Sequence, residues 1–119
     1  MIHGAVAAYH FGGNEKLVRD VKQDAEGAEV SAKMKALLAI ADKVRVSGRN
    51  VLQEDIERAR REGATDVEIH DTVLNAAAFS MYNRYVDGLA TWAPEDPAAY
   101  REEGAKLARE GYLEPEPGR

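Results

Sequence analysis

The feature that most limits the possible folds is a long, almost unbroken apolar stretch at residues 65–87. Thr65, followed three residues later by a glutamate, forms the capping-box pattern that starts a helix. Within the window 72–82, apolar residues point in nearly every direction around the helix axis, and Asn75 and Ser80 are the polar exceptions. A helix that is apolar all round is buried all round. We therefore predict that residues 65–87 form the central buried helix.

Two surroundings can bury such a helix in a chain of 119 residues. It lies either at the centre of its own domain or at a surface that another subunit covers. The second alternative, together with the apolar character of the helix, predicts a homo-oligomer that assembles through helical faces.

The remaining elements are also predicted to be helices. Ser31 is a suitable N-cap for an amphipathic helix, and Asp96 followed by Pro97 is a strong helix start. The helices are expected at 2–10, 15–24, 32–44, 53–62, 65–87 and 97–110. The sequence shows neither strand alternation nor a linker. We predict an all-α bundle of five or six helices, with a single domain over residues 1–113 and a frayed tail at 114–119.

Charge and composition exclude several function classes. The net charge is −5, and the basic residues alternate with acidic ones, which argues against nucleic-acid binding. No apolar run reaches the roughly 20 residues that span a bilayer, so we expect no membrane partner and a cytoplasmic location. Cysteine is absent, which removes disulfides, thiolate metal sites and thiol nucleophiles.

Histidines are the first candidates for chemistry. His3 and His10 are seven residues apart, so on one helix they share a face but lie roughly 10 Å apart along the axis. They cannot bind one metal ion together unless the helix bends, and no metal or cofactor is predicted. Ser80 is expected to bond back to the carbonyl of Ala76 rather than to act as a nucleophile.

Polar residues late in the apolar helix form the second candidate site. Arg84 is expected to pair with Asp87 or with an acid of a neighbouring helix, because a buried charge needs a partner. The alternative interpretation is that Tyr82, Asn83 and Arg84 face a small-molecule pocket or a subunit boundary.

A family resemblance follows from the order of three segments. "HGAVAAYHFGGNEKLVRDV", "KMKALLAIADKV" and "VLQEDIERARREGATDVEIHDTVLNAAAFSMYNRYVDGLATWAPED" together resemble the carboxymuconolactone decarboxylase and alkyl hydroperoxidase D-like (AhpD-like) superfamily, in particular its peroxidase-related branch. The similarity extends over residues 3–112. It implies a helical bundle that assembles through its helical faces.

The resemblance also implies what this chain lacks. Family members reduce peroxides with a C-x-x-C pair followed after three residues by a histidine, which matches His3 here, and then by a turn that matches residues 12–15. The two cysteines and an upstream glutamate of the proton relay would fall before Met1. The chain thus resembles a family member cut downstream of its catalytic cysteines. Because peroxide reduction needs a thiolate, we predict a redox-inactive helical scaffold or ligand-binding module.

The decarboxylase members give the alternative function. They resemble the chain in fold and need no redox dithiol. Proton transfer by a histidine with a nearby acid is sufficient in principle for such chemistry. In this alternative the chain is an enzyme and His3 or His10 is its general acid or base.

Overall fold

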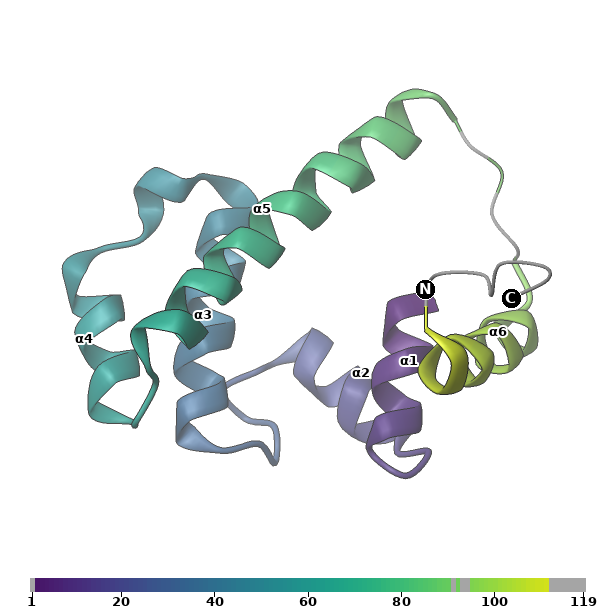
Figure 1. Ribbon diagram of the computed structural model, residues 1–119, viewed down its shortest axis with the longest axis horizontal. Coiled ribbons are helices and arrows are strands. Elements are labelled where there is room, and N and C mark those ends of the chain that lie inside the picture. The colour runs from purple at the N-terminus through teal and green to yellow at the C-terminus, as the bar shows by residue number, and fades with distance from the viewer. Residues whose placement is uncertain (1, 91, 93–94, 112–119) are drawn as a thin grey trace, which may run out of the picture. The chain divides into compact units, whose positions relative to one another are not determined.

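The computed structural model describes residues 2–90, 92 and 95–111, and within these ranges every regular element is helical. The elements are α1 (Ile2–His10), α2 (Glu15–Gln23), α3 (Ala32–Val46), the 3-10 turn η1 (Gly48–Asn50), α4 (Gln53–Arg61), α5 (Asp66–Gly88) and α6 (Pro97–Glu110) (Figure 1). The predicted all-α class and its six helices are confirmed.

Helix starts follow from side chains that accept hydrogen bonds from the first free backbone N–H groups. The hydroxyl of Ser31 accepts from the N–H of Met34 at 3.1 Å. At α5, the hydroxyl of Thr65 accepts from the N–H of Glu68 at 3.1 Å, and the Glu68 carboxylate accepts from the N–H of Thr65 at 2.8 Å. The predicted capping box is therefore formed in full.

Contacts within the chain divide it into two compact units. Unit 1 contains α1, α2 and α6, and unit 2 contains α3, η1, α4 and α5. The single domain over residues 1–113 stays a prediction, and the tail at 114–119 lies outside the described residues.

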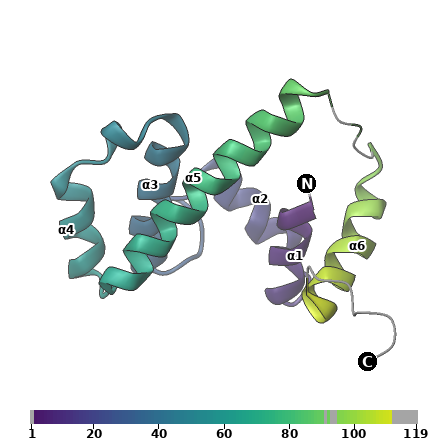
Figure 2. The ribbon, with the colours of Figure 1, turned by 45° about the horizontal axis from the view of Figure 1, so that its top comes forward.

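Unit 2 is built around a small core between α3, α4 and α5 (Figure 2). Ile40 of α3 and Ala59 of α4 are both 0% exposed. Ile69 of α5 joins them at 7%, and Val73 packs against the cluster from the next turn. Because the core residue of α4 is an alanine, the helix can approach α3 closely.

Ion pairs connect the elements of unit 2. Both carboxylate oxygens of Asp55 accept from Lys43 at 2.7 Å, which joins α4 to α3, and one oxygen also accepts from the N–H of Leu52 at 2.8 Å. Lys33 donates to Glu68 at 2.9 Å and joins α3 to α5. The bond from Lys43, followed by the one from Leu52, holds the pKa of Asp55 below its ordinary value of 3.8.

Two further carboxylates of unit 2 are shifted in the same direction. The backbone hydrogen bond from Thr65 and the bond from Lys33 lower the pKa of Glu68 below 4.5. Arg58 donates two hydrogen bonds to Glu26, at 2.9 and 3.1 Å, and these lower the pKa of Glu26. In all three residues, these hydrogen bonds favour the charged form of the carboxylate in the folded state.

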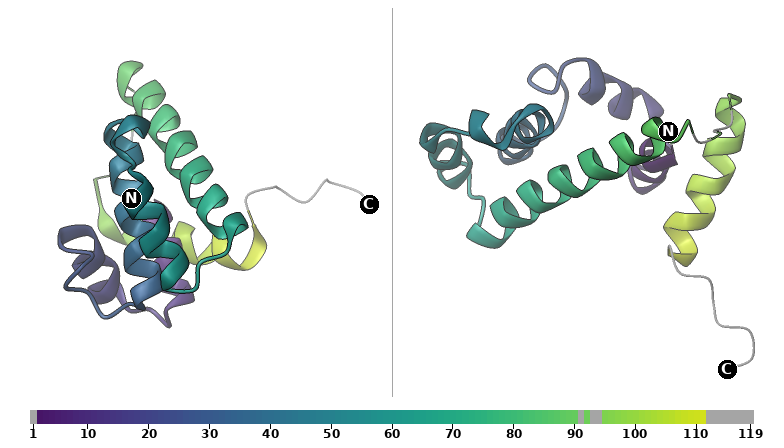
Figure 3. Two further views of the ribbon diagram at one scale, coloured as in Figure 1. Left: turned by 90° about the vertical axis from the view of Figure 1, so that its left-hand side faces the viewer. Right: turned by 90° about the horizontal axis from the view of Figure 1, so that it is seen from above.

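Unit 1 depends on a close approach between helices from distant parts of the sequence. In the views of Figures 1 and 3, α1 and α6 lie side by side. A Cβ atom added to Gly104 of α6 would lie 2.5 Å from the Cβ of Ala5 and 2.9 Å from its carbonyl carbon. Gly104 is itself buried, as is Ala8 of α1. Only small residues permit this approach.

Within one chain, the predicted burial of the helix at residues 65–87 is absent over most of its length, and burial by a second subunit stays a prediction. The helix forms at Asp66–Gly88, but Ile69 is its only buried residue, and every residue of 81–88 is exposed. The physical reason is that α3 and α4 cover a single side of α5 in unit 2. At the other side, Tyr85 and Leu89 are 67% and 63% exposed.

The ion pairs predict how the stability of unit 2 depends on pH. A carboxylate with a lowered folded pKa stabilises the fold above its unfolded pKa and loses this contribution as pH falls through the folded value. The free energy of unfolding should thus fall below about pH 4.5, near the ordinary values of these carboxyl groups. Asp55→Asn should lower the free energy of unfolding by about 1 kcal/mol at neutral pH. In this variant the free energy of unfolding should also decrease less as the pH falls.

Urea unfolding at neutral and acid pH measures both effects. The control is Asp42→Asn, which removes an exposed ion pair with Arg45 inside a single helix. It should change stability little. If Asp55→Asn lost as much stability in acid as the unchanged chain does, the stabilising role of the Asp55 carboxylate would be contradicted.

The close approach in unit 1 gives a second prediction. Gly104→Ala should destabilise the α1–α6 contact by about 1–3 kcal/mol, because the added methyl group meets backbone that cannot move freely. Gly48→Ala is the matched control, since a Cβ atom there meets nothing within 4 Å. Thermal unfolding followed by far-UV circular dichroism compares the two. Equal stability of both variants would refute the close packing.

Candidate functional site

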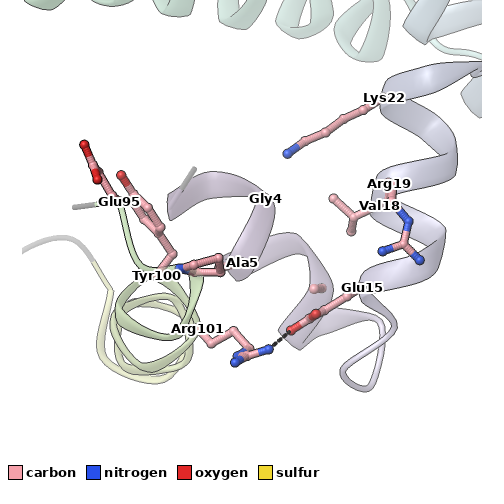
Figure 4. Close-up of a pocket in the computed structure, with 11 residues that line it drawn as sticks. Gly4, Ala5, Glu15, Val18, Arg19, Lys22, Glu95, Tyr100 and Arg101 are labelled. Carbon is pink, nitrogen blue, oxygen red and sulfur yellow. Dashed lines mark ion pairs between the residues drawn. The ribbon is translucent and has the colours of Figure 1, made fainter. Parts of the chain in front are cut away.

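Unit 1 contains a pocket of about 450 Å³ between its three helices. Small residues of α1 form the floor, namely Gly4, Ala5 and Ala8. The two walls come from α2 and from the start of α6 (Figure 4). Pro97 and Tyr100 of α6 add apolar surface. The volume falls in the range of small-molecule sites.

Charged side chains line the rim of this pocket. Three are cationic, Arg19, Lys22 and Arg101, and two are acidic, Glu15 and Glu95, so the rim has an excess of one positive charge. This sign is opposite to the −5 of the whole chain.

The rim cations differ in their partners. Arg101 lies 3.6 Å from the carboxylate of Glu15, and the two form an exposed ion pair (Figure 4). Neither Arg19 nor Lys22 forms an ion pair with any residue that the structure describes. The two positions are three residues apart on α2 and thus lie on neighbouring parts of one helix face. Their charges are available to a ligand.

The ammonium group of Lys22 lies beside Gly4. A Cβ atom on Gly4 would be 2.9 Å from the Lys22 Nζ, and Figure 4 shows Lys22 extending from α2 toward α1 at this point. The absent side chain therefore leaves room for the ammonium group above the floor. Val18 contributes the apolar surface next to it.

The predicted histidine sites lie elsewhere. His3 and His10 are both exposed on α1, and neither lines the pocket. The ring of His10 contacts the edge of Tyr9 at 5.9 Å between centroids. No group of three or more potential ligands in residues 2–90, 92 and 95–111 is arranged to hold a metal ion.

The residues of the predicted site at the end of α5 are exposed, and the hydrogen-bond partner of Arg84 differs from the expected one. Tyr82, Asn83, Arg84 and Asp87 are all exposed. Arg84 donates to the backbone carbonyl of Arg45 at 3.4 Å, and among the described residues it forms no ion pair with Asp87. The expected internal salt bridge is therefore wrong, because the helix end is open to solvent and the charge needs no buried partner.

Ser80 forms the hydrogen bond that its sequence interpretation predicts, and Tyr82 contributes to an exposed surface. The hydroxyl of Ser80 donates to the carbonyl of Ala76 at 2.7 Å, as predicted for a structural serine. The ring of Tyr82 contacts Phe79 edge-on at 6.5 Å and belongs to an exposed apolar surface. That Tyr82 lies at a subunit boundary stays a prediction.

The pocket itself was missed in the sequence. Its floor, walls and rim come from residues near positions 4, 20 and 100, and no local pattern connects them. The one available signal was the pair of basic residues on a single face of α2, Arg19 and Lys22.

Comparisons with known proteins add no relative to this description. Neither protein-family models, nor curated proteins, nor solved structures gave a match to the chain. No helix in the described ranges has both the length and the apolar character required to cross a membrane.

Proposed function

We propose that the chain is a redox-inactive helical domain of the AhpD-like type that acts as a homo-oligomeric scaffold. The observation that supports this proposal is the exposed apolar surface of α5. We call this surface the α5 face and define it by seven residues: Leu74, Phe79, Met81, Tyr82, Tyr85, Val86 and Leu89.

The α5 face occupies one side of the helix. At about 100° per residue its members fall within an arc of roughly 160°. The residues that contact the core, Ile69 and Val73, lie on the opposite side. Tyr85 and Leu89 are the most exposed members, at 67% and 63%. A single isolated hydrophobic residue needs no explanation, but a continuous face does.

The size and chemistry of the α5 face fit a second copy of the chain. Seven large side chains, each about half exposed, present on the order of 800 Å² of surface, which is the share one partner gives to a standard stable interface. The face has no charged member, and it is rich in tyrosine, phenylalanine and methionine, the residue types enriched at interfaces. The absence of charge argues against a charged partner.

The redox part of the proposal depends on the sequence. No cysteine occurs among the 119 residues, so none of them can form the thiolate that attacks a peroxide or the thiol that resolves a sulfenic acid. The resemblance to the AhpD-like superfamily supports the helical and oligomeric parts of the proposal.

The decarboxylase alternative has less support. His3 and His10 are exposed, and neither lines the pocket of unit 1. An acid–base role for either histidine therefore stays a prediction from the resemblance alone.

The scaffold proposal predicts concentration-dependent self-association through the α5 face. Leu74→Glu should weaken self-association by at least about 100-fold, since a buried carboxylate without a partner is costly at an interface. Sedimentation equilibrium across a range of protein concentrations measures the change. Adding Tyr85→Glu to the first substitution should leave a monomer.

Leu52→Glu is the matched control. Leu52 and Leu74 are each 56% exposed, but Leu52 precedes α4 and lies outside the α5 face. Circular dichroism confirms that each variant keeps its helices. A wild-type chain that stays monomeric, or equal weakening by the control, contradicts the proposal.

The missing thiol predicts an inactive protein in a peroxidase assay. With cumene hydroperoxide and a dithiol reductant, peroxide consumption should not exceed that of buffer, because the chain offers no sulfur nucleophile. The control is the same assay after treatment of the protein with a metal chelator. Catalytic consumption that survives the chelator would overturn the redox-inactive assignment.

A further inference from the structure

We propose that the pocket of unit 1 binds a small organic monocarboxylate with a compact apolar body, and that Arg19 and Lys22 hold its carboxylate. This site is separate from the α5 face, which belongs to unit 2. The binding test of this pocket can therefore fail or succeed separately from the self-association test of the α5 face.

The charges of the rim select a monoanion. Arg101 and Glu15 are paired with each other, and the remaining charged rim groups are two cations and Glu95. One carboxylate balances the single excess positive charge. A dianion such as sulfate exceeds this positive charge and is repelled by Glu95.

The chemistry of the two cations favours a carboxylate among monoanions. A guanidinium group presents a planar fork of donors that matches the two oxygens of a carboxylate. The ammonium group of Lys22 adds a second, compact charge from the same helix face, and Gly4 leaves space for it above the floor.

The floor and walls specify the remainder of the ligand. Ala5, Ala8 and Val18 provide no polar side-chain atom, and Pro97 continues the apolar surface. A carboxylate without an apolar body gains nothing from this part of the pocket. The volume of about 450 Å³ accommodates a ring of benzoate size.

The test is a titration of the full-length chain with benzoate, followed by ¹H–¹⁵N NMR. Benzoate should shift the amide signals of the pocket residues with millimolar affinity, as expected for a small ligand at an open site. Arg19→Gln and Lys22→Gln should each weaken binding by about fivefold or more. Both side chains are exposed, so neither variant should unfold the chain.

Four comparisons can overturn the assignment. The control Lys106→Gln removes the same charge from an exposed position of α6 outside the pocket, and it should leave affinity within about twofold. Benzamide lacks the charge, acetate lacks the ring, and sulfate is a dianion. Each of these three probes should bind much more weakly than benzoate. Equal binding by any of them, equal weakening by Lys106→Gln, or no shift with benzoate refutes the proposal.

Discussion

The packing around Ile40 is the constraint on which unit 2 depends. This side chain has no exposed surface, and α3, α4 and α5 meet around it and its neighbours. The core is small, because Ala36, Ala59 and Ala64 make up half of its buried cluster. A core of this size can cover one side of α5 and no more. The exposed apolar α5 face is therefore a direct consequence of how little apolar surface the unit itself supplies.

Helix positions could be predicted from the sequence because their signals are local. The caps at Ser31, Thr65 and Asp96 act within three residues, and each is formed as expected. Ser80 bonds to its own helix for the same reason. Such interactions require no knowledge of what packs nearby, so residue order alone determines them.

The burial of α5 and the pocket could not be predicted in this way. Whether an apolar residue such as Tyr85 is covered depends on the number of neighbouring helices, and the pattern of one helix does not contain that information. The pocket brings Gly4 and Lys22 close to Arg101, which is far away in the sequence. The histidines of α1 do not line the pocket, whereas Arg19 and Lys22 of α2 do.

The pairing of α1 with α6 has a consequence for the order of folding during synthesis. Unit 2 is made of consecutive residues, so all of its helices have been synthesised once α5 is complete. Unit 1 needs its last helix before Ala5 can meet Gly104. The small apolar residues of α1 therefore stay exposed until α6 has been synthesised. During this interval the nascent chain can bind chaperones or aggregate.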